Sequence, residues 1–207
     1  MLLLRPLEKV LSRVLLSMQA QNEIARFEGI IISDPDDNVS FRKTVLAALL
    51  LIKDLDPRRF RRIQAFVKWV VNVPLAYGGG EYSYSMRTCR LDFEKSVWEP
   101  HANYASAICA RMLVHEATHG VINARRIPYS RQLRSRIERL CVREEQRFLS
   151  LIAQSQPQVA KAVWHDFDES QWHESWTDSR SQSLSAIFMR LSRYIETHRE
   201  HDRLIQP

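Results

Sequence analysis

Two long helical segments in the second half of the chain constrain the fold more than any other feature of the sequence. The first is expected to begin near residues 100–103 and to run to about Ala124, because its apolar residues recur at helical spacing without a proline. The second covers residues 131–153 and is separated from the first by Pro128. Consecutive helices of this length predict a fold that is built mainly from helices.

The first part of the chain also has helical patterning. Residues 6–27 carry apolar side chains at spacings of three and four, which favours a helix packed on the core over a helix lying on a membrane surface. Ser40 is expected to cap a helix that reaches about residue 54. Asp56 and Pro57 predict the start of another helix, which should continue to about residue 71.

A short extended region is expected between these helical parts. Three consecutive glycines, at 78–80, precede residues 81–93, which alternate and are rich in Tyr, Thr, Cys and Leu. This pattern is typical of one long strand or of a hairpin arm. A last helix is expected from about residue 177 to 199. The predicted class is therefore α+β, mainly helical, with a small sheet that precedes the central helix.

The chain is long enough for one substantial core. Its 207 residues predict a single domain over 1–207. Within it we expect an N-terminal helical part at 1–74, a core at 75–156 and a C-terminal helical part at 157–207.

Charge and cysteine usage limit the classes of function. The net charge is +6 and the isoelectric point is near 9.5, which permits nucleic acid or an acidic protein as a partner without indicating either. Cys89, Cys109 and Cys141 are odd in number and far apart, which indicates a reducing compartment rather than a disulfide framework. No apolar run reaches the length of a membrane span, and no signal-peptide core is visible. A cytoplasmic protein is the resulting expectation.

The pattern H-E-x-x-H at residues 115–119 carries the chemistry. On a helix, residues four apart lie one above the other, so the two imidazoles project from one face and can bind one metal ion. Glu116 lies about a quarter turn away, where its carboxylate can act as a general base without being a ligand. We therefore expect one Zn²⁺ per chain, held by His115 and His119, with Glu116 as the catalytic residue.

Both histidines are expected on the buried face of their helix. Ile108, Met112 and Ile122 recur with His115 and His119 at spacings of three and four, in a single stripe. A pair of core histidines satisfied by neighbouring groups is the alternative. Two stacked imidazoles beside a carboxylate would be a costly core without a cation, which favours a metal site.

A third protein ligand is needed if one position of the metal is to stay open for water. In metzincins a Gly and a His follow the second His of the motif by three and six residues, but Ile122 and Arg125 stand at those places here. A glutamate from the next helix is the other common solution, and residues 131–153 contain several.

Glu144 is the expected third ligand. It lies four residues after Leu140 and four before Phe148, inside the apolar stripe of its helix. A carboxylate on a core-facing stripe needs a partner, which zinc would supply. Glu145 lies near the edge of the stripe and is the alternative ligand. Glu138 lies further out. A pairing with neighbouring arginines, instead of a metal, fits Glu145 and Glu138 better than Glu144.

This order of elements resembles the gluzincin branch of the zinc metallopeptidases (zincins): a strand, a helix with H-E-x-x-H, and a glutamate on the following helix. Residues 144–148 are also similar to the E-x-x-x-F stretch of the small cytoplasmic zincins that act on transcriptional repressors. The resemblance implies a zincin-like core and a protein or peptide substrate. It further implies that His115, His119 and Glu144 are ligands and that Glu116 is the base.

Two other functions remain open beside a zinc-dependent metallopeptidase. One is a regulatory or nucleic-acid-binding protein with a structural zinc. Structural zinc sites are normally closed by four protein ligands and rich in Cys, and no Cys lies beside this motif. The other is a zinc hydrolase that uses the same water chemistry on an ester or a non-peptide amide.

The residues that would support catalysis are less defined by the sequence. Residues 81–93 are expected to bind substrate backbone as an added strand. Residues 172–176 either wall the cleft or begin the last helix. The candidate donors to a developing oxyanion, each of which also has a structural explanation, are Tyr129, Tyr82, Tyr84, His165 and His173.

Overall fold

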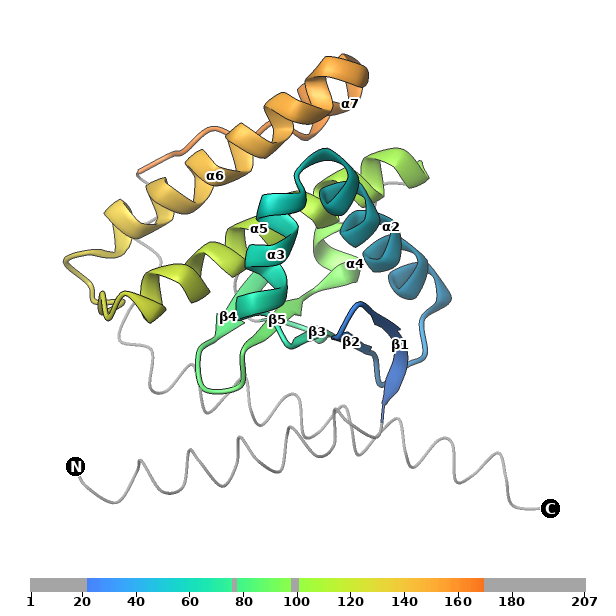
Figure 1. Ribbon diagram of the computed structural model, residues 1–207, viewed down its shortest axis with the longest axis horizontal. Coiled ribbons are helices and arrows are strands. Elements are labelled where there is room, and N and C mark those ends of the chain that lie inside the picture. The colour runs from blue at the N-terminus through green and yellow to red at the C-terminus, as the bar shows by residue number, and fades with distance from the viewer. Residues whose placement is uncertain (1–21, 76–77, 98–100, 170–207) are drawn as a thin grey trace.

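The computed structural model describes residues 22–75, 78–97 and 101–169 and has an α+β architecture (Figure 1). The strands are β1 (Glu23–Phe27), β2 (Ile30–Ser33), β3 (Trp69–Asn72), β4 (Gly80–Ser83) and β5 (Thr88–Leu91). The helices are α2 (Val39–Leu55), α3 (Pro57–Phe66), α4 (Phe93–Ser96), α5 (Ala102–Ala124), α6 (Arg134–Ser155) and α7 (Pro157–Val163). The predicted fold class is confirmed at this level.

The five strands form one mixed sheet in the order β1-β2-β3-β5-β4. The inner pairs are parallel, and the two outer pairs are antiparallel. The hairpin between β1 and β2 turns through Glu28 and Gly29, whose φ angles are 44° and 88°. Two-residue hairpin turns of this kind need positive φ, which glycine adopts without strain. At the opposite edge of the sheet, β4 packs beside α5.

Successive residues of the inner strands face opposite sides of the sheet. In β2, Ile30 and Ile32 belong to the main core, whereas Ile31 faces the other side in a second cluster with Trp69 and Val71. Because both faces are buried, β2 and β3 are apolar along almost their whole length, whereas β5 also buries Thr88 and Arg90.

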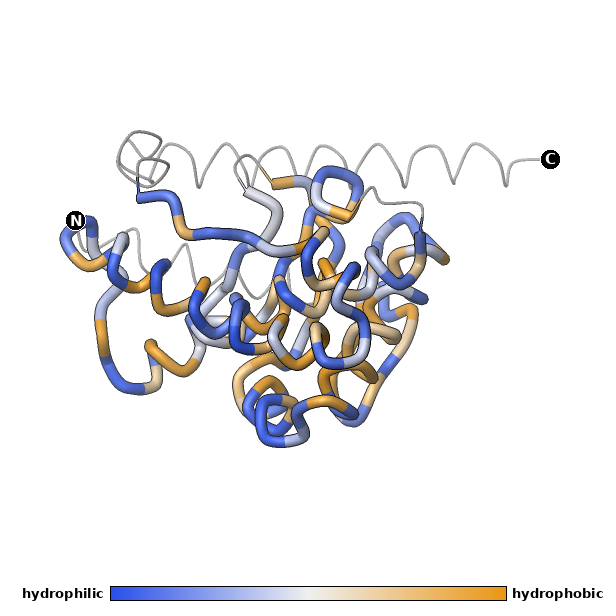
Figure 2. The backbone as a smooth tube through the Cα atoms, turned by 90° about the horizontal axis from the view of Figure 1, so that it is seen from above, coloured by the Kyte–Doolittle hydropathy of each residue, from blue (hydrophilic) through white to orange (hydrophobic). Residues whose placement is uncertain are grey.

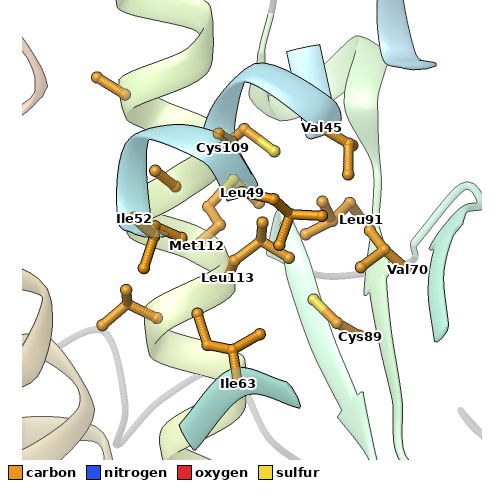
Figure 3. Close-up of a cluster of buried hydrophobic side chains, with 14 of the residues drawn as sticks. Val45, Leu49, Ile52, Ile63, Val70, Cys89, Leu91, Cys109, Met112 and Leu113 are labelled. Carbon is orange, nitrogen blue, oxygen red and sulfur yellow. The ribbon is translucent and has the colours of Figure 1, made fainter. Parts of the chain in front are cut away.

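The main core lies between the sheet and helices α2, α3 and α5, and it continues into buried residues of α6 and α7. Figure 3 shows Leu49 of α2 among Leu113 of α5 and Leu91 of β5, and all three side chains are fully buried. Helix α6 packs along α5 and runs back in the opposite direction (Figure 1). As a result α5 is the central helix, packed between α2 and the sheet on one side and α6 on another.

Hydropathy along the backbone follows this arrangement. Figure 2 shows hydrophobic and hydrophilic residues alternating along the helices, as expected when each helix buries one face. Helix α5 is buried around most of its circumference. Among the described residues, no helix combines the length and the apolarity needed to cross a membrane.

The sequence failed to predict β1, β2 and β3. β1 occupies the end of the segment 6–27 that was expected to be helical, and residues 6–21 of that segment lie outside the described part of the chain. β3 replaces the end of the helix expected to reach residue 71. β2 and β3 are short and buried on both faces, so they lack the alternation of polar and apolar residues by which a strand is predicted.

Some predicted boundaries of the elements are confirmed, and one predicted helix cap is wrong. Asp56 caps α3 and Pro57 stands in its first turn, as predicted. Asn38, rather than Ser40, caps α2, because the Asn38 side chain accepts a hydrogen bond from a backbone N–H of the first turn. The expected extended region is the β4–β5 hairpin, and both long helices of the second half are present. The last helix expected at 177–199 lies outside the described residues.

The crossing of α5 over the end of α3 depends on Gly120. A Cβ at this position would lie 2.7 Å from the Cβ of Phe66 and 2.9 Å from the hydroxyl oxygen of Tyr82. The Tyr82 hydroxyl donates a hydrogen bond of 2.5 Å to the carbonyl of Phe66, so neither neighbour can move freely. The glycine therefore holds α5 close to both α3 and β4.

We expect Gly120→Ala to lower the free energy of unfolding by about 1–3 kcal/mol, measured by urea denaturation. Overpacking of this kind outweighs the roughly 1 kcal/mol that alanine gains over glycine inside a helix. Asn123→Ala, at an exposed position of the same helix, is the control and should change stability by about 0.5 kcal/mol or less. A Gly120→Ala protein as stable as the native protein would contradict the close crossing.

Candidate metal centre

The two histidines of the motif lie one turn apart on α5, on the side that faces α6. Their ring centroids are 5.1 Å apart. His119 is buried and His115 is half-buried. Their position on one face of the helix, one turn apart, is what the four-residue spacing predicts.

Two side chains of α6, Glu138 and Cys141, complete a group of four potential metal donors. One donor atom from each of His115, His119, Glu138 and Cys141 lies within 4.8 Å of the other three. Glu138 approaches both histidines: its Oε2 is 3.0 Å from Nε2 of His115, and its Oε1 is 3.6 Å from Nε2 of His119. Glu138 and Cys141 are three residues apart on one helix, so both side chains project from the same face.

Glu145 contacts the other ring nitrogen of His115. Its Oε1 hydrogen-bonds to Nδ1 of His115, and its Oε2 lies 3.3 Å from the guanidinium of Arg111. A carboxylate in this position orients the ring of a metal-binding histidine and sets its tautomer. The structure thus places Glu145, the alternative third ligand, behind the histidine rather than among the four donors.

Glu144 does not reach the histidines, contrary to our expectation. Its carboxylate accepts hydrogen bonds from Arg59 at 3.1 Å, from Arg62 at 3.2 Å and from Arg147. Glu144 therefore ties α6 to α3. The place expected for Glu144 beside the histidines is occupied by Glu138.

The physical reason for this correction is the rotation of α6 about its axis. Leu140, expected in the core, is 42% exposed, whereas Glu138 is 2% exposed and Glu145 is 4% exposed. Glu138 and Glu145 are seven residues apart and share a face with Cys141, a spacing that was visible in the sequence. This face was not predicted to be buried because carboxylates are rarely buried unless they are paired.

Glu116 is positioned beside β4 rather than within the four-donor group. A Cβ on Gly80 would lie 2.6 Å from Oε1 of Glu116, so the carboxylate lies directly against the start of that strand. Its Oε2 is buried and has no hydrogen-bond partner. Burial raises the pKa of Glu116 to about 6, although His115 and His119 oppose the shift.

The charges of this region are strongly coupled. Burial by itself would lower the pKa of His115, but its hydrogen bonds to Glu138 and Glu145 raise that pKa well above the usual value. Burial by itself would raise the pKa of Glu138, but the two histidines hold it well below the usual range. The hydroxyl of Tyr129 also donates to Glu138. The carboxylates of Glu138 and Glu145 therefore stabilise positive charge between α5 and α6.

The remaining candidate donors to an oxyanion differ in their surroundings. Tyr82 serves the fold through its bond to α3. Tyr84 packs edge-on against Tyr82, with centroids 5.3 Å apart; burial raises its pKa, and acidic groups of the site add to the shift. His165 is half-buried, and burial lowers its pKa. His173 and the segment 172–176 lie outside the described residues.

Comparisons with protein-family models, with curated proteins and with solved structures find no match to this chain.

We expect Glu144 to stabilise the fold and not the candidate metal centre. Glu144→Ala should lower the free energy of unfolding by about 1–3 kcal/mol, because it removes a partner from the largely buried guanidinium of Arg59. Arg26→Ala is the control: it removes an exposed ion pair with Glu23 and should cost about 0–1 kcal/mol. Urea denaturation measures both, and a greater loss in the control would contradict this role of Glu144.

Proposed function

We propose that this protein is a zinc-dependent metallopeptidase in which His115, His119 and Glu138 hold the metal and Glu116 is the general base. The observation that carries the proposal is the position of Glu138, whose two oxygens face the Nε2 atoms of both histidines. Two histidines and one glutamate are a ligand set of catalytic zinc, which admits water as a further ligand.

The types of donor fit Zn²⁺ better than a harder cation. Ca²⁺ and Mg²⁺ are bound mainly by oxygen atoms, whereas imidazole and thiolate suit zinc. The buried charge supports a cation as well, because Glu116, Glu138 and Glu145 are all nearly inaccessible to solvent. Buried carboxylates are costly unless a positive charge offsets them, and a divalent ion does so without relying on protonated histidines.

Each neighbouring side chain has a distinct task in this proposal. When bound, Zn²⁺ supplies Lewis acidity, which polarises a carbonyl group and lowers the pKa of water towards about 7. Glu116 accepts a proton from the attacking water and passes it to the leaving nitrogen, and its unpartnered Oε2 is available for this transfer. Glu145 and Tyr129 hold His115 and Glu138 in place through their hydrogen bonds.

The position of β4 favours a peptide as the substrate. β4 pairs with β5 on one side, and no strand among the described residues pairs with its other edge. The first residue of β4, Gly80, lies against Glu116. An extended peptide that adds to this edge would place its backbone beside the proposed base. An ester or a small amide would not need a strand edge next to the site.

A structural zinc is the second candidate function, and the presence of Cys141 among the donors favours it. Four protein ligands normally close a structural site. The two candidates differ in what they require of Glu116, because a structural site has no use for a general base. Turnover and its dependence on Glu116 therefore separate them.

Purified protein is expected to hold one zinc per chain, measured by elemental analysis. Glu138→Ala should weaken zinc binding by at least the roughly 10–100-fold seen when even outer partners of ligands are lost. Changing both His115 and His119 to Ala should abolish it. Glu144→Ala is the matched control on the same helix and should keep its zinc. Full occupancy in the double histidine variant would overturn the metal site, and loss in the control alone would restore Glu144 as the ligand.

Glu116→Gln is expected to keep both the zinc and the fold but to lose peptide hydrolysis. Loss of a general base costs about 10²–10⁴-fold in rate. Digestion of an unbiased peptide library measures the activity, and Glu94→Gln, at an exposed position of α4, is the control that should retain it. If Glu116→Gln lost the metal, the residue would be a ligand. If the native protein and Glu116→Gln were equally inactive, the structural candidate would be favoured.

A further inference from the structure

Cys141 differs from the other cysteines of the described chain in what surrounds it. Cys89 and Cys109 lie in the main apolar core, as Figure 3 shows. Cys141 is equally buried, but its sulfur belongs to the group of donors that also contains Glu138 and the two histidines. Cys141 also packs in a small apolar cluster with Ile122 and Ile137, so it borders both apolar side chains and the polar donors.

The four donors come in two pairs from two adjacent helices. His115 and His119 are one turn apart on α5, and Glu138 and Cys141 are one turn apart on α6. In tetrahedral zinc sites, bond lengths of about 2.0–2.3 Å place the donors roughly 3.3–3.8 Å from one another. The donors here all lie within 4.8 Å of one another, so shifts of about 1 Å, within the reach of side-chain rotation, would bring them together.

We propose that the sulfur of Cys141 is a fourth protein ligand of the metal, so that two histidines, one glutamate and one cysteine hold the ion at rest. This proposal rests on the proposed metal site. On binding, the thiol of Cys141 gives its proton to solvent, its sulfur bonds to the metal, and one water leaves the metal. Hydrolysis at such a site would require an additional water ligand, and catalytic zinc sites sometimes expand to five ligands in the transition state.

A sulfur ligand changes which metals the site accepts. Thiolate favours Zn²⁺ strongly over Mn²⁺, Mg²⁺ and Ca²⁺, which prefer oxygen ligands. The same chain with an oxygen at position 141 should discriminate less between Zn²⁺ and Mn²⁺. The cysteine therefore sets the metal selectivity of the centre, in addition to its affinity.

Cobalt substitution tests this coordination directly in the full-length protein. The Co²⁺-loaded protein should show d–d bands in the visible range, which report the metal site, and a sulfur-to-cobalt charge-transfer band in the near ultraviolet, which reports the thiolate. Cys141→Ser should keep the d–d bands and lose the charge-transfer band. Cys109→Ser, also buried but in the apolar core, is the matched control and should keep both.

The possible failures are distinguishable. Visible d–d bands without a charge-transfer band in the native protein would overturn the Cys141 proposal and leave the metal centre standing. A charge-transfer band that persists in Cys141→Ser would assign the thiolate to another cysteine and also overturn it. Absence of Co²⁺ binding to the native protein would overturn the metal centre itself, and the Cys141 proposal with it.

Discussion

The contact between Glu138 and the two histidines is the interaction on which the rest of the candidate site depends. It joins α5 to α6 at the point where both helices bury charged side chains. A buried carboxylate, the buried imidazole of His119 and the half-buried imidazole of His115 are each costly alone, but together they compensate one another and could hold a metal ion. Two further hydrogen bonds support this contact. Glu145 holds His115, and Tyr129 holds Glu138.

Two glycines allow α5 and the edge strand β4 to approach each other closely beside the candidate site. At Gly120, α5 packs against Phe66 and Tyr82 with no room for a side chain. At Gly80, the start of β4 lies directly against Glu116. Glu116 is consequently positioned on the strand side of α5, while His115 and His119 face Glu138 on the α6 side. This separation follows from the quarter turn between neighbouring residues of a helix.

Helix α6 carries acidic residues on two faces, and each face has its own compensation. Glu138 and Glu145 point inward, where His115 and Arg111 offset their charge. Glu144 points toward α3, where arginines offset it. The inward pair builds the candidate site and the outward residue secures the helix that carries it. Adjacent glutamates in the sequence thus have unrelated roles, because their side chains point about 100° apart.

The sequence by itself determined the long helices, the α3 cap, the extended region of β4 and β5, and the placement of His115 and His119 one turn apart on one face. Each of these depends on residues close together in the chain. The buried strands β2 and β3 escaped prediction, since a short apolar run has no period by which to recognise it. Only the tertiary structure decided which glutamate faces the histidines. The rotation of α6 is set by its packing on α5 and by the arginines of α3, and a spacing within one helix cannot specify that contact.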